Sequence, residues 1–220
     1  TLMQMKEALQ LKNQEFDYFI NLTDGMVPLK SRMEILAYLK QYPDKDFFYV
    51  DRSEKDDPDL RKKTEKYYPY TNIITFPTNK FVRAMTKGMA SILYAFHSKR
   101  KLEDEILIGS PWFILTRKSA EILIENFSYC SNTYKLSWYA EELYIPMMLH
   151  KFAPERYQEH INDNLRAVGD GKWIESHVVL PCTTKAIETC PNALFGGRIS
   201  AETEAGLYSS YFDIYNANLG

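Results

Sequence analysis

A chain of 220 residues is long enough to bury one α/β core, so we expect a single domain over residues 1–220. Its 45% hydrophobic and 25% charged residues exclude a disordered or a fibrous protein. The formal net charge of −2 lacks the basic excess of nucleic-acid-binding proteins, and the clusters RKKTEK and SKRK are typical of solvated helix faces, so we expect no nucleic-acid partner.

The first predicted elements are a helix and a strand. The chain starts inside a helical pattern, with apolar residues at helical spacing from Leu2 to Leu9, so we expect that a further segment of the protein precedes Thr1. Residues 16–23, FDYFINLT, combine alternation with aromatic and β-branched residues. This pattern predicts a buried strand that ends at a turn beginning with Asp24.

A capped helix is predicted shortly after Pro28. Ser31 can accept a hydrogen bond from the backbone at the start of the helix, and Glu34, three residues later, completes a capping box. The spacing of the apolar residues predicts a buried face made of Met33, Leu36, Ala37 and Leu39.

The middle of the chain alternates strand and helix patterns. Residues 47–50, FFYV, predict a strand, and the charged segment 51–70 after it predicts an exposed excursion. Residues 79–98 predict a long amphipathic helix. Its apolar face is expected to contain Phe81, Met85, Met89, Ile92 and Phe96.

The second half continues this alternation. Residues 106–117, ILIGSPWFILTR, predict a strand pair or one bent strand. Further predicted elements are helices over 118–127 and 139–152, short strands near 165–168, 177–180 and 193–195, and a helix over about 201–214. Because strands and helices alternate, we predict an α/β fold with a largely parallel sheet.

Two adjacent carboxylates, Glu141 and Glu142, occur in the segment SWYAEELYIPMML. Consecutive helical residues are about 100° apart, so one of the two is expected to face solvent. Pro146 cannot donate to the carbonyl of Glu142, so the helix should kink or begin late, which would aim Glu142 into a cleft. Burial beside Trp138 and its aromatic neighbours would raise the pKa of this carboxyl group and favour general-base catalysis. The alternative is a structural glutamate placed by the helix dipole.

The segment NALFGGRIS places two glycines directly before Arg198. Glycines let a backbone approach a ligand closely, and a guanidinium group matches the oxygens of a diphosphate. The alternative is a glycine turn followed by a surface arginine.

Metal, redox and membrane signals are weak. Asp51 follows the FFYV strand, but Ser53 stands where a second metal-binding acid would be needed, so we expect no metal. The three cysteines have no C-x-x-C spacing, which favours a reducing compartment. No apolar run approaches the roughly 18 residues of a membrane-spanning helix, and the first residues have no signal-peptide pattern.

Four segments, in this order, resemble the core-2/I-branching β-1,6-N-acetylglucosaminyltransferase and peptide O-xylosyltransferase family. FDYFINLTDGMVPLKS resembles FDYFINLSGxDYPLKT, and ILIGSPWFILTRKSAEIL resembles KGSQWFxLSRxxxEYL. WYAEELYIPMML resembles SPDEHFFxTLL, and HVVLPC with ALFGGRIS resembles the closing H-x-V and FARKF elements. The resemblance covers the chain from about Leu2 to its end. It implies a GT-A-like (Rossmann-like) fold with a mixed, largely parallel sheet flanked by helices.

The resemblance implies an inverting glycosyltransferase that moves a sugar from a UDP-sugar to a hydroxyl group without a divalent metal. Glu142 matches the glutamate that acts as general base. Arg198 matches the basic residue that holds the diphosphate in place of a metal. Trp112 and Lys30 match positions that line the acceptor side.

The chain departs from the family pattern at several positions. Met26 stands where the family has an acid, with Asp24 two residues earlier, and we expect Asp24 and Glu141 on the substrate side. Val179 stands at the second basic position, a role that Lys185 can take from the following turn. The family's first strand-helix-strand region, which forms much of the uridine pocket, would precede this chain. We therefore expect the C-terminal two thirds of a longer GT-A domain, without its N-terminal nucleotide-binding strands.

The leading hypothesis is a transferase that moves N-acetylglucosamine or xylose onto a glycan or glycoconjugate during polysaccharide biosynthesis, with no cofactor. The alternative is a non-catalytic glycan-binding module that retains the fold. A glycosidase is disfavoured, because Glu141 and Glu142 on one helix cannot lie on both sides of a glycosidic bond. Two locations fit: the cytoplasm of a bacterium, with peripheral association with the inner membrane, or the Golgi lumen of a eukaryote.

Overall fold

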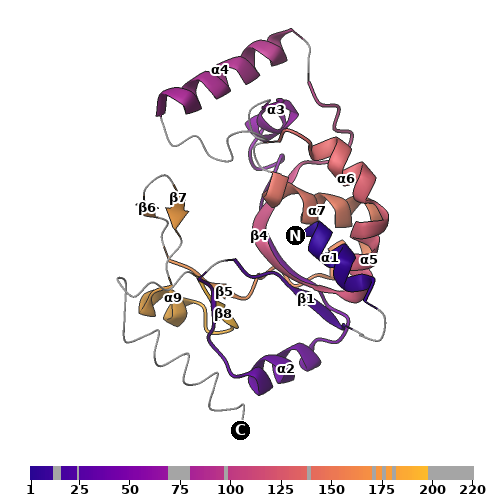
Figure 1. The fold of residues 1–220 in the computed structure, drawn as a ribbon, viewed down its shortest axis with the longest axis vertical. Helices are drawn as coiled ribbons and strands as arrows, with labels where there is room; N and C mark the ends of the chain where they lie inside the picture. The colour runs from indigo at the N-terminus through magenta and orange to yellow at the C-terminus, as the bar shows by residue number, and fades with distance from the viewer. Residues whose placement is uncertain are drawn as a thin grey trace.

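The computed structural model of the chain describes residues 1–11, 16–23, 25–68, 80–96, 99–137, 140–169, 172–174, 177–179 and 182–197. Its helices are α1 (Leu2–Leu9), α2 (Arg32–Gln41), α3 (Asp59–Glu65), α4 (Lys80–Ala95), α5 (Arg117–Glu125), α6 (Phe127–Tyr134), α7 (Ala140–Phe152), α8 (Pro154–Glu159) and α9 (Thr184–Thr189). Its strands are β1 (Tyr18–Ile20), β2 (Val27–Pro28), β3 (Phe47–Ser53), β4 (Leu107–Thr116), β5 (Arg166–Ala167), β6 (Lys172–Ile174), β7 (His177–Val179) and β8 (Phe195–Gly196). Figure 1 shows β4 curving through the middle of the fold, with α5, α6 and α7 beside it.

The central sheet has the strand order β1-β4-β3, and both pairings are antiparallel. Tyr18 pairs with Thr116 at one end of β4, and Ser53 pairs with Leu107 at the other. The register between β3 and β4 shifts on both sides of Val50, and such irregularities bend a strand pair. The expectation of one bent strand over 106–117 is therefore confirmed (Figure 1).

A second sheet has the order β2-β8-β5, and β6 and β7 form a hairpin. Only β5 and β8 run parallel among the named strand pairs that the structure describes, whereas β2–β8 and β6–β7 are antiparallel. The prediction of a largely parallel sheet is therefore wrong for the described strands, although the mixed α/β class is confirmed. An apolar pattern shows which residues of a strand share a face, but it does not fix the direction of the neighbouring strand.

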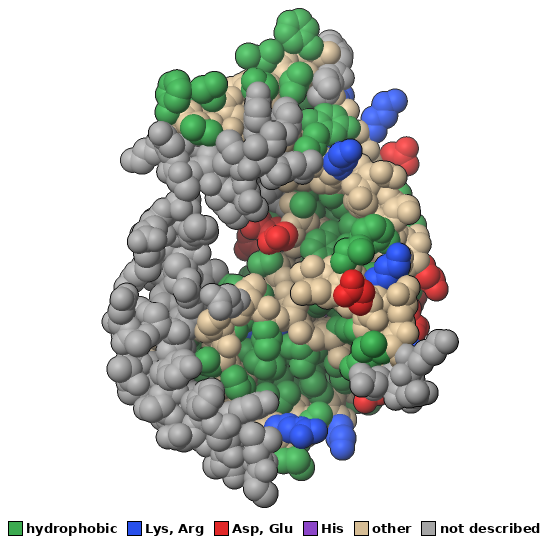
Figure 2. Space-filling model, in the orientation of Figure 1, with side chains coloured by type: hydrophobic (Ala, Val, Ile, Leu, Met, Phe, Trp, Pro, Cys, Tyr) green, Lys and Arg blue, Asp and Glu red, His purple; other side chains and the backbone are tan. Residues whose placement is uncertain are grey.

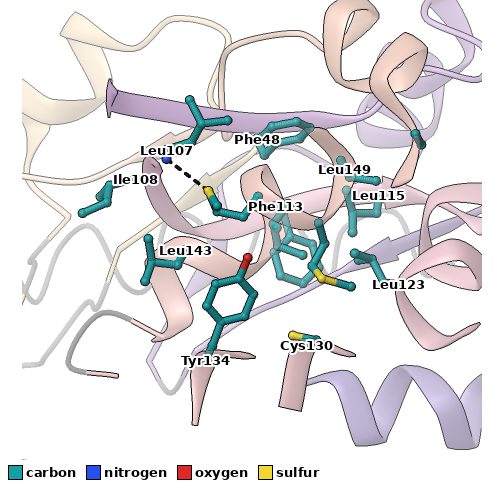
Figure 3. Close-up of a cluster of buried hydrophobic side chains, with 14 of the residues drawn as sticks. Phe48, Leu107, Ile108, Phe113, Leu115, Leu123, Cys130, Tyr134, Leu143 and Leu149 are labelled. Carbon is teal, nitrogen blue, oxygen red and sulfur yellow. Dashed lines mark hydrogen bonds between the residues drawn. The ribbon is translucent and has the colours of Figure 1, made fainter. Parts of the chain in front are cut away.

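The main core lies between β4 and the helices α5, α6 and α7. Phe113 of β4, Leu123 of α5 and Leu149 of α7 are each 1% exposed or less (Figure 3). The backbone N–H of Leu107 donates to Sδ of Met147 at 3.2 Å, which ties β4 directly to α7. Since each such buried apolar side chain contributes roughly 1.5–3 kcal/mol, this packing fixes the position of α7 against the sheet.

The predicted cap of α2 is present. Ser31 Oγ accepts from the backbone N–H of Glu34, and Oε2 of Glu34 accepts from the backbone N–H of Ser31 at 2.8 Å. The predicted buried face is wrong, because Ile35 and Leu39 are buried while Met33 is 65% exposed. The cap is a local property of the sequence, whereas the choice of buried face depends on where the sheet lies.

Other helical expectations are also corrected. α4 (Lys80–Ala95) is shorter than the predicted range 79–98, and the apolar side chains on its expected core face are mostly exposed: Phe81, Met85, Ile92 and Phe96. Figure 2 shows hydrophobic side chains gathered on α4 at the top of the molecule. The segment 51–70, expected to be an exposed excursion, contains α3, in which Leu60 is buried. The predicted helix over 201–214 lies outside the described residues. Among the helices that the structure describes, none is both long and apolar enough to cross a membrane.

A buried polar network fastens the end of β4 and the start of β3 to α5 and α8. Asp46, 2% exposed, accepts from the backbone N–H and the hydroxyl of Thr116 at 2.8 and 3.0 Å and from Ser119 Oγ at 2.5 Å. Nε of Arg156, from α8, donates to the same carboxylate at 3.1 Å. Every oxygen of this buried carboxylate is thus hydrogen-bonded, which is the condition for burying a charge at low cost.

Candidate functional site

The first turn of α7 carries Glu141 and Glu142. Glu141 is exposed and Glu142 is half-buried, as expected for neighbouring helical residues about 100° apart. Pro146 lies inside α7, which runs without interruption from Ala140, so the expectation that the helix begins late is wrong. Glu142 therefore occupies the N-terminal turn, where the helix dipole also favours a carboxylate.

Gly109 of β4 brings three elements into close approach. A Cβ atom at residue 109 would lie 2.3 Å from the carbonyl oxygen of Tyr49 on β3 and 3.6 Å from Cγ of Pro146 on α7. Pro146 follows Glu142 by four residues, so the two side chains lie on the same side of the helix. The side of α7 that carries Glu142 consequently faces the β3–β4 pair.

The surroundings of Glu142 make its carboxyl group more basic than usual. Desolvation by burial raises its pKa above the ordinary value of 4.5, and the negative charges of Glu141 and Asp51 add to that effect. The positive charge of Arg52 opposes it. A partly desolvated carboxylate with one opposing cation is suited to accept a proton at a pH closer to neutral than a solvated glutamate would.

Of the three aromatic neighbours predicted for Glu142, Tyr144 lies within the described residues. Tyr144 packs edge-on against Phe113, with ring centroids 6.5 Å apart, as part of the main core. Trp138 and Tyr139 lie outside the described residues. The desolvation of Glu142 is therefore attributed to its position between α7 and the sheet rather than to particular aromatic rings.

A cavity of about 380 Å³ adjoins the charges that act on Glu142. Asp51 and Arg52 of β3 line it, together with Glu105 and with His150 and Tyr157 from the helical side. Glu142 itself is not among the lining residues. A cavity of this size with both carboxylates and cations in its wall suits a ligand rich in hydroxyl groups, which can both donate and accept hydrogen bonds.

The other predicted site residues are distributed over both sheets. Trp112 of β4 is 8% exposed, and its indole Nε1–H is buried without a hydrogen-bond partner among the described residues. Lys30, which follows β2, is half-buried, and Lys185 on α9 is exposed. These two lysines flank one small core, since their neighbours Leu29 and Ala186 pack in the same cluster. Asp24 and Arg198 lie outside the described residues.

Comparison with known protein families matches residues 1–194 to one family model, Branch, the Core-2/I-Branching enzyme. The chain belongs to the Core-2/I-branching enzyme family. The resemblance inferred from the four sequence segments is confirmed at the level of the family. No curated protein matches the chain with significant similarity.

Membership of the Core-2/I-branching family indicates a glycosyltransferase, which takes a sugar donor and an acceptor. The matched region contains Glu142, Trp112, Lys30 and Lys185, and it ends four residues before Arg198. The proposed role of Arg198 therefore depends on the likeness of ALFGGRIS to the closing family element.

Sequence reasoning missed one cation of this Core-2/I-branching chain. Arg166 on β5 is 4% exposed, and its guanidinium donates to the carbonyl oxygens of Asn164 at 2.7 Å and Asn21 at 2.8 Å. It also stacks on the ring of Phe195 at 4.6 Å, and its Nε has no partner among the described residues. Burial lowers its pKa to about 9, partly offset by Asp163, so it remains charged at neutral pH.

The sequence contains one signal for Arg166. It lies within the short apolar segment LRAV, where a surface arginine is unusual. Its acceptors are carbonyl dipoles and not a carboxylate, so its charge is not cancelled by direct contact. It contributes a fixed positive potential where β5 meets the end of β1. Among the described residues, no group of three or more His, Cys, Asp or Glu side chains is arranged to hold a metal ion.

Proposed function

We propose that the protein is an inverting glycosyltransferase that moves N-acetylglucosamine or xylose from a UDP-sugar to a hydroxyl group of a glycan or glycoconjugate, without a metal ion. The observation that carries this proposal is Glu142, a half-buried carboxylate with a raised pKa that feels the charges of Asp51 and Arg52, two residues in the wall of a polar cavity. Family membership supports the class of reaction.

In this proposal Glu142 is the general base. Its carboxylate takes the proton of the acceptor hydroxyl while that oxygen attacks C1 of the donor sugar. The bond between C1 and the diphosphate oxygen breaks, and both of its electrons leave with UDP. Attack from the face opposite to UDP inverts the configuration at C1. The raised pKa increases the basicity of Glu142, while Arg52 keeps the carboxylate ionised.

The departing diphosphate requires fixed positive charge when no metal is used. We assign this role to Arg198, with Lys185 as the second cation, because a guanidinium fork binds two phosphate oxygens at once. Arg166 adds positive potential from beneath the surface without contacting the ligand. Such preorganised cations stabilise the charge that develops on the leaving group.

The acceptor side is assigned to Lys30, Asp24, Glu141 and Trp112. Because Trp112 is 8% exposed, its ring face is not available for stacking on a sugar. Its Nε1–H is buried as well, so Trp112 supports the acceptor side from beneath the surface rather than by contact with the sugar.

The experiment that tests this function is incubation with a panel of UDP-sugars and oligosaccharide acceptors, with and without a chelator. Release of UDP that depends on the acceptor and persists with the chelator supports the proposal. UDP release that requires added metal contradicts the metal-independent mechanism. No UDP release with any donor contradicts the transferase assignment.

The second candidate is a glycan-binding module that keeps the fold without catalysis. It is favoured by Met26, a half-buried apolar residue at the position where the family carries an acid. Calorimetric titration separates the two candidates, because binding of an oligosaccharide without any binding of UDP supports the module and UDP binding supports the enzyme.

A further inference from the structure

The two sheets of the protein carry different parts of the proposed reaction. Glu142 lies on α7, which packs against the central sheet β1-β4-β3. The second sheet, β2-β8-β5, carries the residues assigned to the diphosphate. Arg198 follows the end of β8 by two residues, and Lys185 lies on α9, which shares an apolar cluster with β5. Inverting transfer requires the base and the leaving group on opposite sides of one sugar, so the placement of the two sheets sets the geometry of the reaction.

Arg166, the first residue of β5, joins the two sheets. It is 4% exposed, and Nη2 of its guanidinium donates to the carbonyl oxygen of Asn21, directly after β1, at 2.8 Å. Nη1 donates to the carbonyl oxygen of Asn164 at 2.7 Å, and the guanidinium carbon lies 4.6 Å from the ring centre of Phe195 on β8. Figure 1 shows β5 and β8 lying between α9 and β1. One side chain therefore contacts the end of a central strand and the middle strand of the second sheet.

Both asparagines that accept from Arg166 are tied to β4. The side chain of Asn21 donates to one backbone carbonyl of β4 at 2.7 Å and accepts from one backbone N–H of that strand at 2.6 Å. Nδ2 of Asn164 donates to Oγ of Ser110, also on β4, at 2.8 Å. Hydrogen bonds thus run from β4 through two asparagines to the guanidinium. We call Arg166, Asn21, Asn164 and Ser110 the polar junction.

An apolar cluster also spans the two sheets. Ile114 of β4 packs in one cluster with Leu194 and Phe195 of the β8 segment. Apolar burial is non-directional, so this cluster holds the sheets together without fixing how one is placed along the other. Hydrogen bonds require narrow distances and angles, and a planar guanidinium fork holds its acceptors in a fixed arrangement. The polar junction therefore supplies the direction that the apolar cluster lacks.

The backbone between Asn164 and Arg166 is strained. Leu165 has a φ of 56°, in the left-handed region that bulky side chains rarely adopt. Such a conformation persists where the surroundings over-determine it, and it is common at functional sites. Here the backbone N–H of Leu165 donates to Oδ1 of Asp163 at 2.7 Å, and the N–H of Arg166 donates to Oδ1 of Asn164 at 3.0 Å. The chain keeps a strained residue at the point where the polar junction forms.

We propose that Arg166 is a positioning residue of the transfer reaction. Through the polar junction it fixes the second sheet, with the diphosphate cations, at the distance from Glu142 that one sugar requires. Arg166 itself contacts neither the donor nor the acceptor. This role rests on the proposed function, whereas the placement of the sheets is measurable without catalysis.

The chain offers a matched control, Arg100. It is 3% exposed, its guanidinium donates to the backbone carbonyls of Thr64 and Lys135, and it lies 4.9 Å from the ring centre of Tyr67. Its burial corrects the expectation of a solvated SKRK cluster. Like Arg166, it has a buried Nε without a partner among the described residues. Arg100 joins α3 to the end of α6, outside the strands of both sheets, so Arg100→Met removes a comparable buried cation away from the polar junction.

The first measurement is the ratio of sugar transfer to hydrolysis of the UDP-sugar, with donor and acceptor both saturating. The ratio does not depend on the fraction of folded protein, so a loss of stability alone leaves it unchanged. When the acceptor hydroxyl is misplaced relative to the donor, water still reaches C1, so hydrolysis is kept while transfer falls. We expect Arg166→Met to lower the ratio by at least about tenfold. Ser110→Ala, a milder variant that removes one hydrogen bond of the junction, should lower it by about threefold, and Arg100→Met should leave it unchanged.

The second measurement is the distance between two spin labels by double electron–electron resonance. The labels are attached to p-acetylphenylalanine introduced at Glu125, which is exposed at the end of α5, and at Glu188, which is exposed on α9. α5 packs against the central sheet and α9 against the second, so the labels report how the sheets are placed. We expect one narrow distribution of distances in the wild type and in Arg100→Met, and a broader or shifted one in Arg166→Met. Circular dichroism verifies that each variant is folded.

Three results would overturn the proposal. The first is a wild-type ratio of transfer to hydrolysis in folded Arg166→Met, or in Ser110→Ala if Arg166→Met does not fold. The second is an equal fall of the ratio in Arg166→Met and Arg100→Met. The third is an unchanged distribution of spin-label distances in folded Arg166→Met. A wild type that transfers no sugar refutes the proposed function instead, and the spin-label distances then decide alone whether the polar junction places the sheets.

Discussion

Asp46→Asn tests whether the buried network holds the frame that supports the candidate site. The Asp46 side chain is 1% exposed and that of its ion-pair partner Arg156 is 12% exposed, with Nε and Oδ2 3.1 Å apart. Asparagine removes the charge and replaces one carboxylate oxygen by an NH2 group. Because Oδ1 accepts from the N–H and the hydroxyl of Thr116, and Oδ2 from Ser119 and Arg156, two donors lose their acceptor whichever oxygen is replaced. Breaking a buried pair by changing one partner costs about 3 to 5 kcal/mol.

The matched control is Asp44→Asn. Asp44 also faces Arg156, at 3.4 Å, but its side chain is 52% exposed, and asparagine tolerates its positive φ of 62°. Exposed ion pairs contribute about 0 to 1 kcal/mol. Urea unfolding followed by circular dichroism gives the free energy of unfolding of each variant. An unchanged dependence of that free energy on urea concentration shows that the unfolded states are comparable. A loss below about 1 kcal/mol for Asp46→Asn, or equal losses for both variants, would refute the reasoning.

Three further predictions concern the site and its neighbours. Arg52→Gln removes the cation that lowers the pKa of Glu142, so the acid limb of the pH–rate profile should move to higher pH; an unmoved limb contradicts Glu142 as the base. Gly109→Ala places a Cβ atom 2.3 Å from the carbonyl oxygen of Tyr49 and should lower the thermal unfolding midpoint. Its control is Gly88→Ala in α4, where a Cβ atom meets no other atom within 4 Å, and this variant should raise the free energy of unfolding by about 0.5–1 kcal/mol. Arg198→Ala should weaken UDP binding by about 1.5–3 kcal/mol in calorimetry, and unchanged affinity excludes its diphosphate role.

The stability of the protein should also depend on the ionisation of Glu142. Its folded-state pKa is raised, so the folded state binds this proton more tightly than the unfolded state does. Stability is then lost as the pH rises from the ordinary value toward the raised one, and the loss persists above it. Because glutamine carries no charge to desolvate, a Glu142→Gln variant should be at least as stable as the wild type at neutral pH. A loss of transfer in that variant then reports on the chemistry and not on unfolding.

Local features of the fold were predictable from the sequence. The capping box of Ser31 and Glu34 depends on two residues three positions apart, and both of its hydrogen bonds are present. The presence of α4 follows from its spacing of apolar residues. The spacing does not show whether another part of the protein covers the apolar face. Met85 and Ile92, which were expected in the core, are exposed.

Features that depend on distant partners were not predictable. Arg166 is buried because the carbonyl of Asn21, far away in the sequence, accepts its hydrogen bond and Phe195 covers its plane. The direction of neighbouring strands depends on connections that no local pattern encodes. The half-burial of Glu142 follows from the close approach of β3, β4 and α7 at Gly109. From the sequence, Gly109 indicated only a break in the strand.

The central claim is that Glu142, and not its neighbour, removes the acceptor proton. The most direct measurement is the rate of sugar transfer by Glu142→Gln and Glu141→Gln, with the same UDP-sugar and acceptor and with UDP affinity measured in parallel. We predict that Glu142→Gln binds UDP as the wild type does and loses transfer by about 100-fold or more. Glu141→Gln should keep its kcat, with any change confined to the KM for the acceptor. Full transfer by Glu142→Gln, or an equal loss in both variants, would contradict the account.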